Sequence, residues 1–371
     1  MEHIFERLEH HHKSNLPFVV YRKPNKDRIK AILQRSDELH ITKHFKESGF
    51  VFSPFDNSVD SILTPLSESE IITASEKDID KNDQNSTLLS QTHSTHKDFH
   101  IALVEQGIRA IKNGKFQKVV LSRREICDFK KDSPLTIFKN LLASYQSAFV
   151  YCWFHPKVGL WLGATPETLL KIEGRNFSIM SLAGTQNYNG NLDVVWQEKE
   201  LQEQQFVTDF ILDNIQEDVN NIQVSSLETI KAGNLLHLRT LIKGVLSVTD
   251  INFKRLLYNL HPTPAVCGMP KALAKAFILE HEDYDREFYT GFLGELNLET
   301  EVKPRTGRRN IENRAYTVKR KSTQLYVNLR CMQIKDNKAL VYVGGGITET
   351  SNPESEWEET VAKSKVVKKV L

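Results

Sequence analysis

Lys118 is the first residue in this sequence whose type and position could do chemistry. It stands within a predicted strand, FQKVVLS, on the same face as Phe116 and Val120. A lysine between apolar strand positions either protects an exposed sheet edge or is a buried base, and taken alone this lysine favours the edge role. Burial lowers the pKa of a lysine amine, and a general base at neutral pH needs a lowered pKa. Lys118 is therefore a candidate base.

Two further segments could supply an acid and an anion site. Glu167 lies in GATPETLL between two predicted strands, where Gly163 and Pro166 favour a turn. Taken alone, this position favours a surface carboxylate. The three glycines Gly344–Gly346 directly follow another predicted strand. Their bare backbone N–H groups could bind an anion, and the alternative is a flexible strand end.

Carboxylates recur at helical spacing in two segments. Glu356 and Glu359 are three residues apart with Lys363 four further on, and Glu200 and Glu203 open another predicted helix. Such groups commonly form a salt-bridged surface or complement a helix dipole. Two helices that bring carboxylates to one place could instead hold a hard cation. Mg2+ takes one or two carboxylates together with substrate oxygens and water.

No single motif for another chemistry accompanies these residues. The sequence has no P-loop, no GxGxxG after a strand, no GxSxG and no HExxH. The cysteines are widely spread with no CxxC, which argues against structural zinc and against a disulfide framework. They are Cys127, Cys152, Cys267 and Cys331.

The elements that must position these residues are mostly hairpins separated by helices. Strands joined in this way predict a mixed α/β or α+β domain dominated by antiparallel sheet. Apolar periodicity predicts helices over 99–113, 200–219 and 354–371. The predicted strands are 116–122, a strand–turn–strand over 149–162, a hairpin formed by 168–172 and 177–180, and a second hairpin formed by 324–334 and 339–343.

The N-terminal part differs in composition from the rest. Residues 1–98 form a predicted strand-rich subregion that ends in a polar linker over 66–98. Residues 99–371 hold all the candidate residues, and we expect the two parts to form one structural domain. The basic segment 303–321 could touch nucleic acid, but it lacks aromatic platforms beyond Tyr316 and favours a solvated hairpin extension.

Composition excludes several classes of protein. The 371 residues include 49 Lys+Arg and 47 Asp+Glu, for a net charge of +2, which argues against a nucleic-acid-binding protein. Hydrophobic residues make up 40%, enough for a sizeable core. No apolar stretch approaches the roughly 18 residues that span a bilayer, and the charged N-terminus lacks the apolar stretch of a signal peptide. We expect a soluble cytoplasmic protein with reduced cysteines and no membrane partner.

Six motifs occur in a specific order. They are KVVLSR (118–123), LGATPETLL (162–170), SLAGTQ (181–186), LHPTPAVCGMP (260–270), YVNLRCMQI (326–334) and GGGI…EWEET..K (344–363). In this combination the chain resembles the chorismate-binding enzymes, the family of isochorismate, salicylate, anthranilate and aminodeoxychorismate synthases. The resemblance runs from about residue 99 to the C-terminus and covers the N-terminal third only loosely. It implies a fold of large antiparallel sheets packed as a sandwich with helices on the outside.

Lys118 decides which activity the resemblance implies. Water-using members of the family carry this lysine as the base on water, and ammonia-using members lack it. The implied reaction is the Mg2+-dependent, reversible conversion of chorismate to isochorismate, feeding menaquinone or catechol siderophore synthesis. The alternative is a salicylate synthase, which goes on to eliminate pyruvate, and the wall at Tyr289–Gly291 is expected to help decide between them. A remote alternative is an inactive relative that only binds an anion.

The resemblance also assigns roles residue by residue. Glu167 matches the general acid, while Arg330 and Lys363 match contacts to substrate carboxylates, helped by the amides of Gly344, Gly345 and Gly346. Thr185 and His237 match further pocket positions. Glu203 and Glu359 match the Mg2+ ligands, with Glu356 as a direct or water-mediated ligand. One departure is Gln204, where the family often has histidine. The implied partners are chorismate and isochorismate, with no glutaminase subunit, and we expect a monomer.

Overall fold

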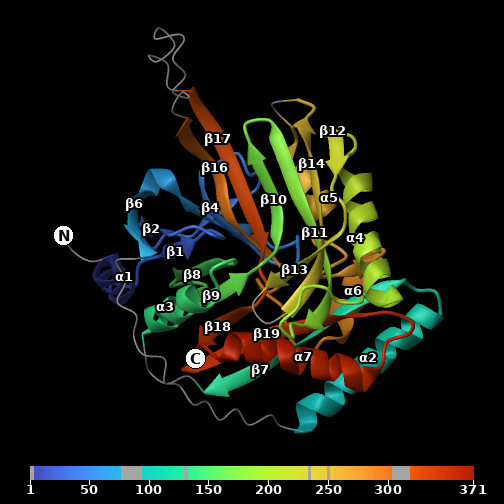
Figure 1. The fold of residues 1–371 in the computed structure, drawn as a ribbon. Helices are drawn as coiled ribbons and strands as arrows, with labels where there is room; N and C mark the ends of the chain where they lie inside the picture. Colours follow the sequence, from blue (N-terminus) through green and yellow to red (C-terminus); the bar gives the residue numbers. More distant parts are fainter. Residues whose placement is uncertain (1–3, 77–93, 129–132, 233–234, 249–250, 303–317) are drawn as a thin grey trace.

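Two large antiparallel sheets face each other, with helices on the outside (Figure 1). The expected α/β class, a sandwich dominated by antiparallel sheet, is confirmed. The computed structural model describes residues 4–76, 94–128, 133–232, 235–248, 251–302 and 318–371.

The first sheet has nine strands and carries the candidate base. Its order is β15 (Gly268–Met269), β7 (Lys118–Asp128), β19 (Lys338–Ile347), β18 (Cys331–Lys335), β9 (Gly159–Thr165), β8 (Phe149–His155), β1 (Phe18–Arg22), β2 (Arg28–Gln34) and β6 (Ser69–Ser75).

The second sheet has ten strands: nine follow one another in a single path, and the tenth, β13 (Glu228–Ala232), pairs with β14 beside that path. The order is β12 (Val219–Val224), β14 (Leu235–Leu246), β11 (Asn176–Asn187), β10 (Thr168–Glu173), β17 (Val318–Val327), β16 (Phe292–Val302), β4 (Gly49–Ser53), β5 (Ser61–Pro65) and β3 (His40–Thr42).

Helices cover the outer faces of both sheets. The nine-stranded sheet packs against α1, α3 and α7 on one part and against α2 and α6 near β7, whereas α4 and α5 cover the ten-stranded sheet (Figure 1). The bounds are α1 (Ile4–Lys13), α2 (Ser94–Lys112), α3 (Pro134–Ser144), α4 (Glu198–Ile215), α5 (Phe253–Leu260), α6 (Lys271–His281), α7 (Pro353–Lys368) and the 3-10 helix η1 (Leu66–Glu68).

Aromatic side chains fill the space between the sheets. Phe52 of β4 stacks on Phe288 with ring centroids 4.3 Å apart, and Phe149 of β8 stacks on Tyr326 of β17 at 4.1 Å. Every residue of β4 is buried, because Val51 points the other way, into the core beneath α5. A strand buried on both faces is continuously apolar, as GFVF is here.

The two helices that carry the predicted carboxylates begin at well-formed caps. The Asn352 side chain accepts a hydrogen bond from the Ser355 amide at 3.1 Å, and Pro353 takes the first position of α7. Such caps satisfy amides that have no partner within the helix. At the start of α4, Glu200 accepts a hydrogen bond from the Gln197 amide at 2.9 Å. Glu200 is therefore a capping residue, which leaves Glu203 as the carboxylate of this helix that faces inward.

Most predicted elements are confirmed, but the strand predicted over 324–334 is wrong. Residues up to Val327 belong to β17 in the ten-stranded sheet, whereas β18 begins at Cys331 in the other sheet. The chain crosses between the sheets over 328–330, where Arg330 has a left-handed backbone with φ +49°. The sequence YVNLRCMQI gives no local sign of this break, because its apolar pattern continues through it.

Part of the predicted polar linker is regular structure. Residues 66–75 form η1 and β6, and α2 begins at Ser94, while residues 77–93 lie outside the described residues. β6 is the edge strand of its sheet and pairs with β2. Polar side chains are typical of an edge strand, which is why composition alone suggested a loop. Strands from residues 18–75 enter both sheets, so this part shares its cores with the rest of the chain.

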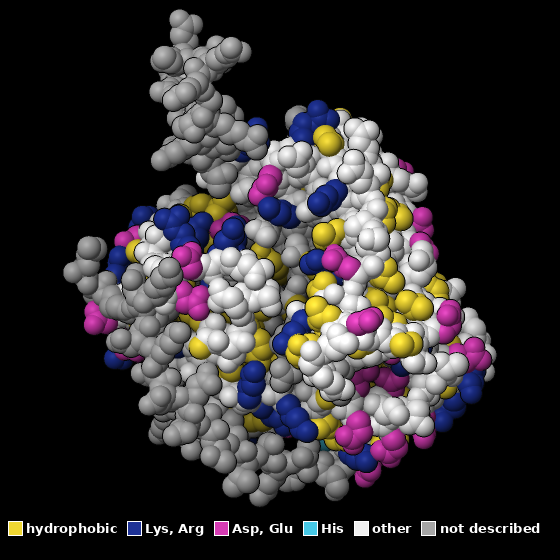
Figure 2. Space-filling view, in the orientation of Figure 1, with side chains coloured by type: hydrophobic (Ala, Val, Ile, Leu, Met, Phe, Trp, Pro, Cys, Tyr) yellow, Lys and Arg dark blue, Asp and Glu magenta, His cyan; other side chains and the backbone are white. Residues whose placement is uncertain are grey.

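The surface carries both charges in mixture. On the face drawn in Figure 2, basic and acidic side chains are interspersed, and no broad field of one sign covers it. The basic segment predicted as a hairpin extension begins after β16, and residues 303–317 lie outside the described residues. None of the described helices is both long and apolar enough to cross a membrane.

All four cysteines are free and buried, in three separate parts of the core. Cys127 and Cys152 lie beneath α1 and α3, Cys331 lies between the sheets, and Cys267 lies beneath α2 and α6. Burial raises the pKa of each thiol, to about 11 for Cys127 and Cys267. The thiols therefore act as small apolar groups in the native protein.

Candidate active site

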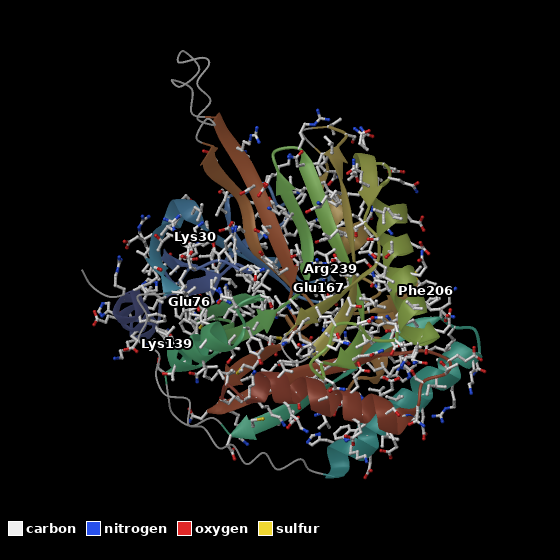
Figure 3. All side chains as sticks on the ribbon, in the orientation of Figure 1. Lys30, Glu76, Lys139, Glu167, Phe206 and Arg239 are labelled. Carbon is white, nitrogen blue, oxygen red and sulfur yellow. The ribbon has the colours of Figure 1, made fainter. Side chains whose placement is uncertain are left out.

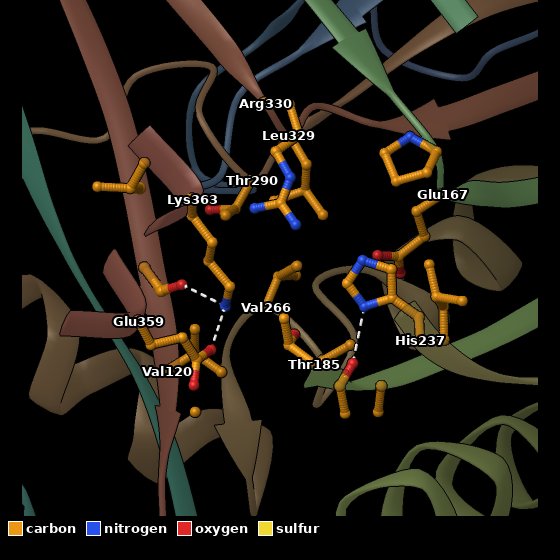
Figure 4. Close-up of a pocket in the computed structure, with 18 of the residues that line it drawn as sticks. Val120, Glu167, Thr185, His237, Val266, Thr290, Leu329, Arg330, Glu359 and Lys363 are labelled. Atoms are coloured by element: carbon orange, nitrogen blue, oxygen red, sulfur yellow. Dashed lines mark hydrogen bonds and ion pairs between the residues drawn. The ribbon is translucent and has the colours of Figure 1, made fainter. Parts of the chain in front are cut away.

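A pocket lies where the two sheets meet, between β7 and β19 on one side and β11 and β14 on the other, with α4 and α7 beside it. It contains about 760 Å³ that no protein atom fills, part of it open to solvent. Figure 3 shows Glu167 near the centre of the molecule, and Figure 4 looks into the pocket. The predicted site residues that line it are Lys118, Glu167, Thr185, Glu203, His237, Arg330, Gly344, Gly346, Glu359 and Lys363.

Lys118 is a buried residue of a central strand. It opens β7, which pairs with β15 on one edge and with β19 on the other, and its side chain is only 2% exposed. The edge-protection role that the residue favoured when taken alone is therefore wrong. The Nζ atom lies 3.6 Å from Oε1 of Glu203 on α4. Lys118 thus brings an amine to the pocket wall, beside a carboxylate.

The glycines of β19 present two of their three amides to the pocket. The register pairs Gly346 with Val120, Gly345 with Leu121 and Gly344 with Ser122. Because the Val120 amide bonds to Cys267 on the far edge of β7, Leu121 and Gly345 form the hydrogen-bonded pair. The backbone groups of Gly344 and Gly346 therefore point away from β7, at a level where β18 no longer pairs with β19. They are available to an anion, and those of Gly345 are not.

Each of the predicted metal-ligand carboxylates lies beside a lysine. Glu203 faces Lys118, as described above. Glu359 Oε1 lies 2.5 Å from Lys363 Nζ, which also donates to the Gly344 carbonyl at 2.9 Å. Both Lys363 contacts are drawn in Figure 4.

The third carboxylate, Glu356, is buried just outside the pocket. Its Oε1 accepts a hydrogen bond from Lys199 of α4 at 2.6 Å. Burial raises the pKa of Glu356, with Lys199 opposing the shift. For Glu359, burial also acts to raise the pKa, but the Lys363 ammonium outweighs it and the net shift is downward. The α4–α7 side of the pocket therefore balances carboxylates against ammonium groups.

The three carboxylates converge around the glycines of β19. A Cβ built on Gly346 would lie 2.5 Å from Glu203 Oε1, and one built on Gly345 would lie 3.5 Å from Glu356 Oε2 and 3.7 Å from Glu359 Oε1. Both Glu203 Oε1 and Glu356 Oε2 are buried without a hydrogen-bond partner. As they stand, no three His, Cys, Asp or Glu side chains among the described residues are arranged to hold a metal ion. Two carboxylate oxygens that accept no hydrogen bond, beside a backbone without side chains, nevertheless fit a small hard cation.

The last residue of the KVVLSR motif fixes α7 against β7. The Arg123 guanidinium lies 4.3 Å over the ring of Trp357, and its Nε donates to Thr360 Oγ1 at 2.8 Å. Trp357 and Thr360 alternate along α7 with Glu356 and Glu359. Arg123 therefore connects the strand of the candidate base with the helix of the candidate cation ligands.

Arg330 is a half-buried cation that has no carboxylate partner among the described residues. It stands at the crossover between the sheets, and Figure 4 shows its guanidinium pointing into the pocket. Burial lowers its pKa from the usual value, yet within the part of the chain that the structure describes it forms no ion pair. Withdrawing an unpaired charge even partly from water is costly, so the arrangement favours an anionic ligand.

Glu167 is fully buried, which corrects the surface position it favoured when taken alone. It is 3% exposed, and burial raises its pKa to about 8, with Lys118 and Arg330 opposing the shift. At neutral pH its carboxyl is therefore mostly protonated and can donate a proton. A raised carboxyl pKa inside a pocket is typical of a general acid.

His237 adds a hydrogen-bond acceptor next to the acid. Burial lowers its pKa to about 3, so the ring is neutral. Its Nδ1 lies 2.7 Å from the Gly184 carbonyl and must carry the proton, because a carbonyl only accepts. The Nε2 atom is buried without a partner. Thr185 follows Gly184 in β11 and also lines an adjoining outer hollow with Glu359.

Sequence reasoning found most of this pocket and missed parts of it. Lys199 went unnoticed because its partner lies 157 residues away on another helix. Ala265 and Val266 line the pocket within the motif LHPTPAVCGMP, and only that motif could have pointed to them. Together the residues offer a proton donor, an amine and an anion site around one cavity. This combination suits acid–base chemistry on a small anionic substrate.

The raised pKa of Glu167 predicts a dependence of stability on pH. An unfolded glutamate has a pKa of about 4.3, so between there and about 8 the folded protein holds a proton that the unfolded chain has lost. The free energy of unfolding therefore falls as pH rises through this range. The free energy of unfolding of Glu167→Gln should rise relative to that of the wild type by up to about 1.4 kcal/mol per pH unit. This difference should become constant above pH 8.

Urea denaturation of both proteins between pH 5 and pH 9 measures this difference. Glu280→Gln, a substitution at a side chain that is 77% exposed, controls for the exchange itself. If the difference in the free energy of unfolding between wild type and Glu167→Gln does not change with pH, the assignment of a protonated carboxyl is contradicted.

Comparisons with known proteins agree with this architecture. E. coli K12 isochorismate synthase MenF is 27% identical over 296 residues, which cover 77% of this chain and 63% of that protein. E. coli K12 isochorismate synthase EntC is 30% identical over 260 residues, with coverages of 66% and 60%. The matched part thus spans about three fifths of the length of these curated relatives.

Solved structures share the fold. A Bacillus anthracis protein described as a 2,3-dihydroxybenzoate-specific isochorismate synthase, DhbC, superimposes with a TM-score of 0.77 at 22% identity over 99% of both chains. MenF from E. coli gives 0.74 at 21% identity over 96% of this chain and 88% of that one. Family models described as chorismate binding enzyme match residues 46–303 and 315–369. The chain belongs to the chorismate-binding enzymes.

Proposed function

We propose that this protein interconverts chorismate and isochorismate, as an isochorismate synthase. The proposal rests on three groups that line one pocket. They are the buried, protonated carboxyl of Glu167, the Lys118 amine and the unpaired Arg330 guanidinium. A substrate with two carboxylates and a hydroxyl leaving group needs these three functions. The names of the relatives, MenF and EntC among them, support the same reaction.

Substrate binding falls to the cationic part of the pocket. Arg330 would pair with one carboxylate of chorismate, and the free amides of Gly344 and Gly346 would donate to an anionic oxygen beside it. Lys363 already bonds to Glu359 and Gly344, so it would contribute a third contact from a fixed position. The Nε2 atom of His237 would accept a hydrogen bond from a substrate hydroxyl.

Proton transfer would use the two remaining groups. The Lys118 amine takes a proton from a water molecule as the water oxygen bonds to C2 of the ring. The double bonds shift, the C4–oxygen bond breaks, and Glu167 gives its proton to the departing hydroxyl, which leaves as water. One water enters and one leaves, so the reaction is an isomerisation. In reverse, each group takes the opposite role.

We further propose that Glu203 and Glu359, with Glu356 directly or through water, hold a magnesium ion. Glu203 Oε1 and Glu356 Oε2, which accept no hydrogen bond, support this assignment. When bound, Mg2+ supplies positive charge that favours the negative charge growing on the ring carboxylate. Arg123 would keep the α7 carboxylates in place through Trp357 and Thr360.

Product analysis tests the proposed reaction. Incubation with Mg2+ from either chorismate or isochorismate should reach the same mixture of the two, as separated by chromatography. A coupled lactate dehydrogenase assay should detect little pyruvate, because the proposed chemistry breaks no bond to the enolpyruvyl group. Stoichiometric pyruvate with fluorescent salicylate would instead identify a salicylate synthase, and no turnover would refute the proposal.

The metal proposal predicts that turnover requires a divalent cation. EDTA should abolish activity and Mg2+ should restore it, and Mg2+ should raise the Tm of the wild type, since a bound ligand stabilises the native state. Glu359→Gln should lose both effects and remain folded. Glu354→Gln, on the exposed start of the same helix, is the matched control. Full activity in metal-free buffer would count against the assignment.

The base proposal predicts that Lys118→Ala loses turnover by a factor of roughly 10²–10⁴, mostly in kcat. Lys118→Arg should not rescue it, because arginine stays charged. Lys118 also faces Glu203, so both variants should be assayed at saturating Mg2+. Lys171→Ala, which removes a strand lysine paired with Glu173, serves as the control. If Lys118→Ala keeps a near wild-type kcat, the base lies elsewhere.

A further inference from the structure

A buried ion pair lies directly behind the pocket, outside the residues considered so far. Arg286 follows α6 and is 2% exposed. Its Nε donates to Glu282 Oε2 at 2.8 Å and its Nη2 donates to Glu282 Oε1 at 2.6 Å. This two-point geometry is the strong form of an arginine–carboxylate pair and fixes the plane of the guanidinium.

The remaining donors of Arg286 reach three separate parts of the pocket wall. Nη2 donates to the Val120 carbonyl at 2.7 Å, and Nη1 donates to the Val266 carbonyl at 3.1 Å and to Thr290 Oγ1 at 3.3 Å. All three of these residues line the pocket. The contacts occupy all five N–H groups that a guanidinium has.

Glu282 also bonds to β7, the strand that carries Lys118. Its Oε1 accepts hydrogen bonds from the amide and the hydroxyl of Ser122, both at 2.8 Å. Val120 and Ser122 are the second and fourth residues after Lys118 in β7. The position of this strand relative to the opposite wall therefore depends on the Arg286–Glu282 pair.

Thr290 is the strained part of that wall. Its φ is +59°, a left-handed conformation that a β-branched residue rarely adopts. Its amide donates to Asn328 O, and its carbonyl accepts from His261 Nε2, both at 2.9 Å. Strain of this kind persists where the surroundings over-determine the conformation, and it concentrates at functional sites.

We propose that Arg286 is a positioning residue for substrate binding, which holds the strained Thr290 and the walls at Val120 and Val266 at a fixed separation. The inference rests on the proposed function, because the ligand of this pocket is taken to be chorismate. A lysine cannot replace the arginine, since three donors on one atom cannot reach the carboxylate and three walls together.

The test compares Arg286→Lys with Arg22→Lys. Arg22 is equally buried and bonds to Glu76, Gln146 and the Leu142 and Tyr145 carbonyls, but it does not line the pocket. Both variants should lower Tm. Arg286→Lys should also raise the KM for chorismate, and its Kd by calorimetry, by about tenfold to a hundredfold. The Mg2+ concentration for half-maximal rate should stay the same, because the guanidinium contacts none of the proposed ligands.

These measurements distinguish failure of the positioning role from failure of the proposed function. If wild type and Arg22→Lys turn over chorismate and Arg286→Lys shows unchanged KM and Kd, the positioning role is overturned and the residue is structural only. If Arg286→Lys does not fold, Thr290→Val removes the hydroxyl through which Arg286 reaches the strained residue. That variant should raise KM several-fold, and an unchanged KM would overturn the inference. If wild type neither binds nor converts chorismate, the proposed function fails and the inference fails with it.

Discussion

The pairing of β7 with β19 is the constraint on which the pocket depends. Ten residue pairs in continuous register, from Asp128 with Lys338 to Val119 with Ile347, bring together segments more than 200 residues apart. Because side chains alternate along a strand, a shift of one residue would turn Lys118 out of the pocket and bring a different amide to the free edge of β19. Arg123 on one face and the Glu282–Arg286 pair on the other then fix how α7 and the far wall stand against this register.

The electrostatics divide the pocket into two halves. On the α4–α7 side, Lys118, Lys199 and Lys363 each lie beside one of the three carboxylates. On the other side Arg330 has no such partner among the described residues. Glu167 is protonated there, because Lys118 and Arg330 only partly offset the rise in its pKa that burial causes. The half with Arg330 and Glu167 is suited to receive negative charge and to release a proton, whereas the half with the three carboxylates is suited to a cation.

The sequence predicts those structural features that arise from a local residue pattern, and it does not predict features that depend on contacts between distant segments. Alternating apolar residues around Lys118 and helical spacing of Glu356 and Glu359 are local patterns, and the structure reproduces both elements. The break at Arg330 could not be predicted, since it arises from the chain passing between two sheets in a left-handed conformation that arginine does not favour. The contact between Lys199 and Glu356 depends on how two helices approach, and a single sequence contains no record of that approach. β6 was misjudged because a solvent-facing edge strand has the composition of a loop.

The placement of the four thiols has a consequence for how opening of this fold can be followed. Two lie beneath α1 and α3, one between the sheets and one beneath α2 and α6, and burial makes each thiolate rare in the closed protein. A thiol reagent can reach each of them only when its own part of the core opens. The rates at which a disulfide reagent labels Cys127, Cys152, Cys267 and Cys331 therefore report separately on local opening of three parts of the core, without any engineered cysteine.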